Sequence, residues 1–156
     1  MNLIIEYYKP KNDHRNSEYL FCIEKKIDSN LFKEIHVFVE NTELPDNISS
    51  KVIVHNSDRK TFQELFNYCN EKFPNEICII SNTDIIFDET IKYVNDNNIK
   101  DRFLCLTRWN VLPDGNMRFF DNNAGAAYFS QDSWIFKTPV PIKNADFFMG
   151  KPGCDN

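Results

Sequence analysis

Short apolar runs alternate along the chain with segments of helical periodicity, and this alternation constrains the fold more than any other feature. Runs rich in β-branched residues predict strands over residues 2–8, 34–40, 51–55, 76–81 and 102–107. Apolar residues at spacings of three and four predict helices over residues 16–29, 61–72 and 89–97. Alternating strands and helices are typical of a parallel α/β sheet, which we expect over roughly residues 1–108.

Helix caps and strand burial follow from the same patterns. Ser57 or Asp58 is the expected N-cap of the helix over 61–72, and Asp88 is the expected cap of the helix over 89–97. The run over 76–81 is almost wholly apolar, which indicates a central strand covered on both faces. The run over 102–107 is expected to be a further buried strand.

The pattern changes after Trp109. The sequence Pro113-Asp114-Gly115-Asn116 is a strong turn signal and predicts a hairpin over residues 110–120. Residues 121–127 read as a loop and residues 133–137 as a short apolar segment, followed by an irregular, proline-containing tail. We therefore expect a single domain over residues 1–156, in which an appended β and loop region follows the sheet.

Charge and composition exclude several classes of protein. The chain of 156 residues has a net charge of −5 and no Lys/Arg cluster, so nucleic acid is not an expected partner. No apolar run approaches the ~18 residues of a membrane span, and the N-terminus lacks the features of a secretory signal, so a cytoplasmic location is expected. The first four of five cysteines lie among apolar neighbours and are expected to be buried, reduced thiols.

Polar and aromatic residues follow the predicted strands, at the edge where open α/β sheets bind ligands. The most informative group is Asn82-Thr83-Asp84, which leaves the predicted central strand. Asn82 and Asp84 are two residues apart and share a face in extended backbone. An acid there can hold a divalent cation that bridges a diphosphate. The alternative is that Asp84 only terminates a strand and Asp88 only caps a helix.

Two further acids are candidates for chemistry. Asp132 lies in the apolar stretch 130–137, where partial burial would raise its pKa and suit it to proton transfer, unless it only caps a short helix. Asp155 follows two glycines and a proline in residues 150–156. These residues either give the backbone a special path just before the acid or belong to a frayed terminus.

Four segments together resemble glycosyltransferases of the GT-A type, and specifically small GT-A domains found in bacteria and in large DNA viruses. These segments are residues 81–88, 103–109, 130–136 and 150–156. The resemblance implies a GT-A, Rossmann-like, mostly parallel sheet flanked by helices, with a C-terminal β and loop region. It also implies a nucleotide-binding part over 1–108 and an acceptor-side part over 109–156, which is either minimal or truncated. For a viral protein, the expected location is the host cytoplasm.

The family holds manganese or magnesium against the donor diphosphate with an Asp-x-Asp motif, which reads Asn82-Thr83-Asp84 here. The resemblance therefore implies that Asp84 is the metal ligand and that Asn82 contacts the ribose or the metal. It further implies that Tyr7 stacks on the base, that Glu40 accepts a hydrogen bond from the base or ribose, and that Arg59 pairs with phosphate or ribose.

The resemblance also assigns the acceptor side. Asp132 would be the general base of an inverting transfer, with Asp155 as its rival or as a second metal ligand. Arg108 would support the phosphates and Trp109 would stack on a sugar. The implied function is metal-dependent transfer of a sugar from a nucleotide-sugar, first of all a UDP-sugar, to a glycan or other hydroxyl acceptor. The alternatives are a GT-A-like nucleotide- or glycan-binding module and, last, a nucleotidyltransferase.

Overall fold

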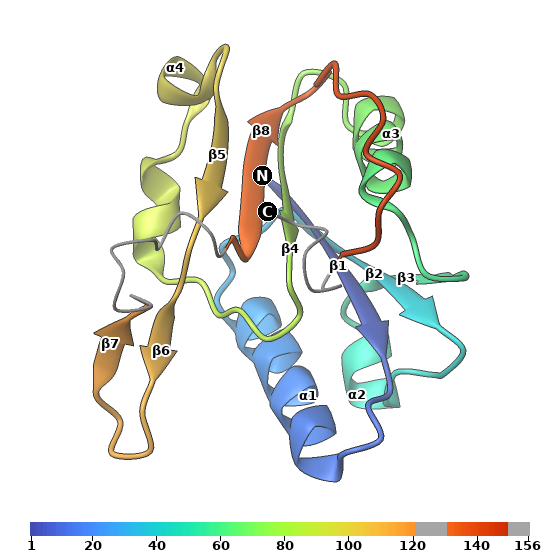
Figure 1. Cartoon of the computed structure of the whole chain (residues 1–156), viewed down its shortest axis with the longest axis vertical. Helices are drawn as coiled ribbons and strands as arrows, with labels where there is room; N and C mark the ends of the chain where they lie inside the picture. Colours follow the sequence, from blue (N-terminus) through green and yellow to red (C-terminus); the bar gives the residue numbers. More distant parts are fainter. Residues whose placement is uncertain (121–130, 150–156) are drawn as a thin grey trace.

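A six-stranded, mostly parallel sheet forms the centre of the molecule in the computed structural model, which describes residues 1–120 and 131–149 (Figure 1). The strand order is β3-β2-β1-β4-β8-β5. Strands β1, β2, β3 and β4 run parallel, whereas β8 lies antiparallel to both β4 and β5. The bounds are β1 Asn2–Tyr8, β2 Glu34–Glu40, β3 Ile53–Asn56, β4 Ile77–Ser81, β5 Phe103–Leu106 and β8 Ser133–Lys137.

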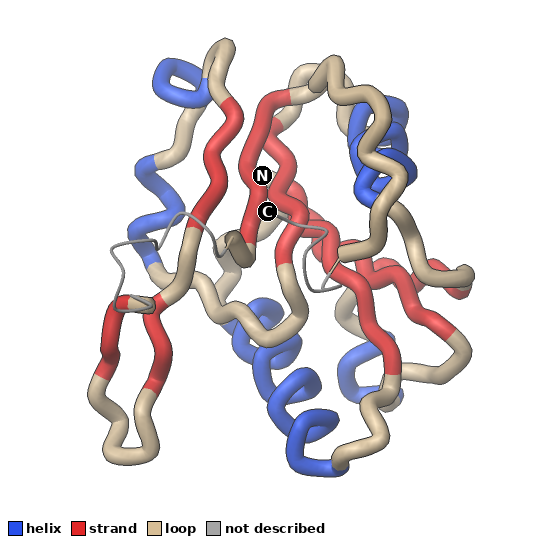
Figure 2. Tube along the Cα trace, viewed as in Figure 1, coloured by secondary structure: helices blue, strands red, loops and turns tan. Residues whose placement is uncertain are grey.

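Helices cover both faces of this sheet (Figure 2). They are α1 Asp13–Asp28, α2 Asp46–Ser49, α3 Phe62–Lys72, the 3-10 helix η1 Glu89–Tyr93 and α4 Asp96–Ile99. Side chains alternate between the faces of β1, so Leu3 and Ile5 pack in one core cluster with Ile23 of α1, while Ile4 packs in a second cluster with Leu65 of α3. The sheet therefore separates two apolar layers, as in other α/β folds.

The strands and helices predicted for the first half of the chain are largely confirmed. The predicted bounds of β1 and β2 match the structure, and the helix predicted over 16–29 begins three residues earlier, capped by the Asn12 side chain. The expected cap of α3 is wrong, because Thr61 rather than Ser57 or Asp58 accepts from the backbone NH of Glu64. The Glu64 carboxylate accepts in return from the Thr61 NH, which completes a capping box.

The helix predicted over 89–97 is divided in two. Asp88 caps η1 as predicted, by accepting from the backbone NH of Thr90, but the turn ends at Tyr93. Asn95 then caps the separate short helix α4. The hairpin predicted around Gly115 is also present, as β6 Trp109–Val111 and β7 Met117–Phe119, and Gly115 has a φ of 82° in its turn.

Two expectations about the second half are corrected. Strand β5 was expected to be buried, yet it lies at the edge of the sheet, and Cys105 and Leu106 are exposed there. Cys22, Cys69 and Cys78 are buried free thiols, as expected. The segment Ser133–Lys137 does not belong to an appended region, because it enters the main sheet as β8 between β4 and β5. Residues 133–136 of β8 are buried, with Ile135 in one core cluster and Trp134 and Phe136 in the other.

The expected loop over 121–127 and the tail with Cys154 and Asp155 lie outside the described residues. No helix in the described part of the chain combines the length and the apolar character that crossing a membrane requires.

Candidate functional site

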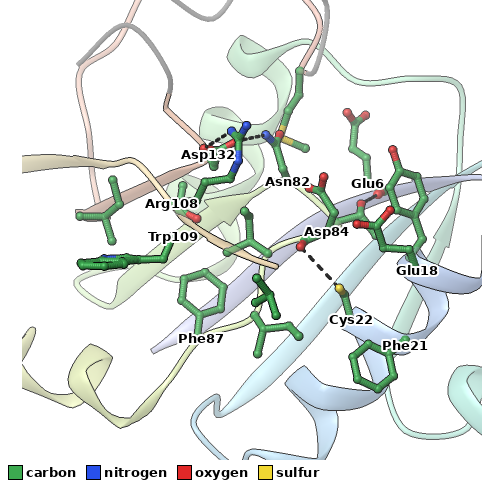
Figure 3. A pocket seen from close by; sticks show the side chains of 18 of the residues that line it. Glu6, Glu18, Phe21, Cys22, Asn82, Asp84, Phe87, Arg108, Trp109 and Asp132 are labelled. Atoms are coloured by element: carbon green, nitrogen blue, oxygen red, sulfur yellow. Dashed lines mark hydrogen bonds and ion pairs between the residues drawn. The ribbon is translucent and has the colours of Figure 1, made fainter. Parts of the chain in front are cut away.

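A cavity of about 1400 Å³ opens at the edge of the sheet where β1, β2 and β4 end (Figure 3). The carboxyl ends of parallel strands meet at this edge, and the antiparallel β8 presents its amino end there. Every site residue predicted within the described part of the chain lines this cavity: Tyr7, Glu40, Arg59, Asn82, Asp84, Arg108, Trp109 and Asp132. Asp155 lies outside the described residues.

Asp84 forms an ion pair with a residue that the sequence did not single out. The Asp84 Oδ2 atom accepts from Arg15 Nη2 of α1 at 2.6 Å, and Arg15 Nη1 donates to Glu18 at 2.7 Å. The guanidinium also lies 4.8 Å from the centre of the Tyr19 ring. The carboxylate expected to hold a metal thus already faces a cation supplied by the protein.

The backbone of the Asp84 segment rests on the same helix. Lys26 Nζ donates to the Thr83 carbonyl at 2.5 Å, and the Cys22 thiol donates to the Asp84 carbonyl at 3.4 Å. Cys22 lies seven residues after Arg15 and four before Lys26, so the three side chains share one face of α1. Burial lowers the pKa of Lys26 to about 8, although Asp84 favours its charged form. Burial of this lysine could not be predicted from the sequence, because a lysine side chain is normally exposed.

Asp132 and Arg108 form the second polar centre of the cavity. Arg108 Nη1 donates to both carboxylate oxygens of Asp132, at 3.0 and 2.9 Å, and Asn82 Nδ2 donates to Oδ1 at 3.1 Å (Figure 3). The guanidinium also lies 4.3 Å from the centre of the Phe120 ring. A carboxylate held in this way is oriented, and because a carboxylate has about four acceptor positions, these three hydrogen bonds do not by themselves prevent it from taking a proton.

Glu6 is a further acid that sequence reasoning missed. It lines the cavity near the end of β1, and its Oε1 atom accepts from the Lys60 backbone NH at 2.7 Å. Burial raises the pKa of Glu6 to about 7, a change that Lys60 and the Arg59 charge only partly oppose. The signal available in the sequence was an acid within an otherwise apolar strand. A carboxyl group that titrates near neutral pH is suited to exchange protons.

Burial argues against the stacking role expected of Tyr7, because its side chain lies in the core and 2% of the residue's surface is exposed. Its hydroxyl donates to Asn16 at 2.9 Å, so only the edge of this residue reaches the cavity. The adjacent Tyr8 is 41% exposed and also lines the cavity, which makes it the better stacking candidate.

Arg59 closes another part of the cavity wall. Its guanidinium donates to the Met149 carbonyl and lies 5.7 Å from the centre of the Phe148 ring. Arg59 thereby ties the segment after β8 to the edge of the sheet, close to Glu6 and on the same wall as Glu40.

Trp109 and Phe119 form an exposed aromatic pair on the hairpin. Their ring centres are 5.3 Å apart, and 58% of the surface of Trp109 is exposed. Trp109 lines the cavity at the side opposite α1 (Figure 3). An exposed ring beside a polar cavity is suited to contact the apolar face of a sugar.

The donor atoms of the cavity fit tight binding of a divalent cation only if a ligand contributes as well, and without a ligand they fit weak binding. Within residues 1–120 and 131–149, no group of three or more histidine, cysteine, aspartate or glutamate side chains is placed to hold a metal ion. The described lining nevertheless carries more carboxylates than guanidinium groups: Glu6, Glu18, Glu40, Asp84, Asp88 and Asp132 against Arg15, Arg59 and Arg108. Magnesium is commonly bound by one or two carboxylates together with substrate phosphates, which this lining permits.

Comparisons with known proteins reach only the level of overall shape. No protein-family model matches the chain, and no curated protein sequence matches it. The structure is similar to a crystal structure from Desulfovibrio desulfuricans G20, of a protein provisionally named a nucleotide-diphospho-sugar transferase. The similarity covers 93% of this chain and 70% of that chain, at 9% sequence identity and a TM-score of 0.48.

Proposed function

We propose that the protein is a glycosyltransferase that transfers a sugar from a nucleotide-diphospho-sugar to a glycan or other hydroxyl acceptor. A UDP-sugar is the favoured donor. The observation that supports this best is the convergence of three arginines and several acids at the carboxyl edge of a mostly parallel sheet. The cavity of about 1400 Å³ exceeds the ~300–1,000 Å³ of an ordinary small-molecule pocket, so it has room for a donor and an acceptor together.

In this proposal the nucleotide lies over the ends of β1 and β2. Tyr8 stacks on the base, Glu40 accepts a hydrogen bond from the base or ribose, and Arg59 pairs with ribose or phosphate. The diphosphate lies toward Asn82 and Asp84, where manganese or magnesium would be held by Asp84 and by the amide oxygen of Asn82. The cation, when bound, supplies charge neutralisation for the departing diphosphate.

On the acceptor side, Arg108 supports the phosphates and Trp109 contacts the sugar. Asp132 orients Arg108 through both of its carboxylate oxygens. Asp132 acts as the general base, held in place by Arg108 and Asn82 while it accepts the proton of the acceptor hydroxyl. Asp155 is the rival for this role.

A binding module without turnover is the second candidate. The observation that favours it is Asn82, whose neutral amide stands where the family's motif has its first acid, so the cation would have one carboxylate fewer, and whose Nδ2 atom is bonded to Asp132. Measuring free nucleotide released from the donor separates this module from an enzyme.

The test is a thermal-shift panel of UDP-, GDP- and dTDP-sugars, each with and without manganese. We expect one nucleotide to stabilise the protein more with manganese than without it. Asp84→Ala should abolish the manganese-dependent part, whereas Asp28→Ala, an exposed acid of α1 outside the cavity, should leave it intact. If no member of the panel stabilises the wild-type protein, the proposed function is wrong.

A further inference from the structure

The cation that neutralises Asp84 is Arg15, and it comes from a helix that contributes no residue to the predicted site. The two side chains are joined at 2.6 Å and remain accessible, with 41% of Arg15 and 25% of Asp84 exposed. A metal ion that binds Asp84 must therefore compete with Arg15 for the same carboxylate. A half-exposed ion pair of this kind is weak enough to exchange.

Arg15 keeps its place on α1 when it leaves Asp84. Its Nη1 atom stays bonded to Glu18, one helical turn further along, and its guanidinium stays against the Tyr19 ring. A guanidinium group carries five N–H donors in a fixed plane, so the Nη2 side released by Asp84 can bind another oxyanion at once. A phosphate of a donor bound in the same cavity would be such an oxyanion.

Charge balance in the cavity favours such an exchange. Even without Glu6, which keeps its proton up to about pH 7, the described lining has five carboxylates against three guanidinium groups, so a diphosphate entering alone meets net repulsion. A divalent cation on Asp84 removes part of that repulsion and also frees Arg15. Neither partner of the original ion pair is then left without a counter-charge.

We propose that Arg15 and the donor-bound cation exchange places on Asp84, with Arg15 passing from the carboxylate to the diphosphate as the nucleotide binds. This inference rests on the proposed function, because it requires a nucleotide diphosphate in the cavity. It assigns Arg15 two opposite effects. Arg15 weakens the binding of a metal alone, and it strengthens the binding of the nucleotide with the metal.

The experiment measures free manganese by electron paramagnetic resonance in titrations of the whole protein, first without nucleotide. We expect Arg15→Gln to bind manganese about two- to fivefold more tightly than the wild type, since the competing ion pair is gone. Lys25→Gln removes an exposed charge from the same helix, outside the cavity, and should leave the affinity unchanged. Adding Asp84→Asn to Arg15→Gln should remove the gain, which shows that manganese is bound at Asp84.

A second titration measures UDP, GDP and dTDP binding by calorimetry at saturating manganese. We expect Arg15→Gln to lower the affinity for the nucleotide about tenfold, because one charge-assisted contact is lost. Arg15→Lys should recover part of that affinity. Thermal unfolding of each variant verifies that it is folded.

The outcomes separate the inference from the proposed function. If Arg15→Gln leaves manganese affinity unchanged or lowers it, there is no exchange, whatever the nucleotide does. If manganese binds more tightly but the nucleotide is not weakened, Arg15 does not pass to the phosphates. If the wild-type protein binds none of the three nucleotides, the proposed function fails and the exchange fails with it, even where Arg15→Gln tightens manganese.

Discussion

Replacing Glu6 by glutamine should stabilise the protein at pH 8 far more than at pH 5. Burial raises the pKa of Glu6 from 4.5 to about 7, so the folded protein keeps a proton that the unfolded chain loses over this interval. The unfolded state binds fewer protons there, and the free energy of unfolding therefore falls as pH rises from about 4.5 to 7. Glutamine has no proton to lose, so the variant escapes this fall.

The size of the effect follows from the same two pKa values. Each pKa unit corresponds to about 1.4 kcal/mol, so ionising Glu6 in the folded protein costs at most about 3 kcal/mol at pH 8. At pH 5 the corresponding cost is less than about 1 kcal/mol, because this pH lies only about half a unit above the pKa of 4.5 in the unfolded chain. The stability difference between Glu6→Gln and the wild type should thus grow by about 2 kcal/mol from pH 5 to pH 8.

Urea unfolding followed by circular dichroism at pH 5, 6, 7 and 8, at constant ionic strength, measures this difference. Glu64→Gln is the matched control. The Thr61 backbone NH lowers the pKa of Glu64, so its contribution is complete by pH 5 and its loss should be constant across the series. A Glu6→Gln difference that is equally flat would refute the argument that Glu6 is buried with its proton.

Three further predictions concern the cap, the buried lysine and the second polar centre. Thr61→Ala should cost about 1 kcal/mol of stability in urea unfolding, and Thr61→Ser should restore most of it, because the hydroxyl is what caps α3. Burial lowers the pKa of Lys26 from 10.5 to about 8, so the free energy of unfolding of the wild type should rise by up to about 3 kcal/mol between these two pH values. Lys26→Met should lack this rise in urea unfolding. If the variant shows the same rise, Lys26 is not the group responsible for it. Asp132→Asn should slow sugar transfer about a hundredfold in a donor-turnover assay at saturating donor, where a change in nucleotide affinity from the lost Arg108 ion pair does not contribute, and normal turnover would leave the general-base role to Asp155.

Much of the sheet could be predicted because its strands carry local signals. β1, β2 and β4 are mostly apolar, and side chains on both of their faces are buried, so composition alone indicates strands. The parallel arrangement of β1, β2, β3 and β4 also predicts that the polar residues following these strands lie at one edge of the sheet. Asn82 and Asp84, which follow β4, and Arg59, which follows β3, are residues of this kind, and they line one cavity.

The partners of these residues could not be predicted in the same way. Arg15 and Lys26 lie on a helix whose apolar stripe predicts burial but not which polar groups the stripe will meet. Asp132 was recognised as an unusual acid, yet its contact with Arg108 depends on where β8 enters the sheet. Tyr7 and Tyr8 are neighbours of the same type, and only the packing of α1 decides which ring is covered.

The sequence by itself determined the alternation of strands and helices, the turn at Gly115 and the set of polar strand exits, because these depend on residues close together in the chain. Tertiary structure alone decided that β8 lies between β4 and β5, that β5 becomes an edge, and that Asp84 faces Arg15 and Asp132 faces Arg108. These contacts join residues 69 and 24 positions apart. Their geometry is set by how the sheet and helices pack, and local propensity carries no information about that.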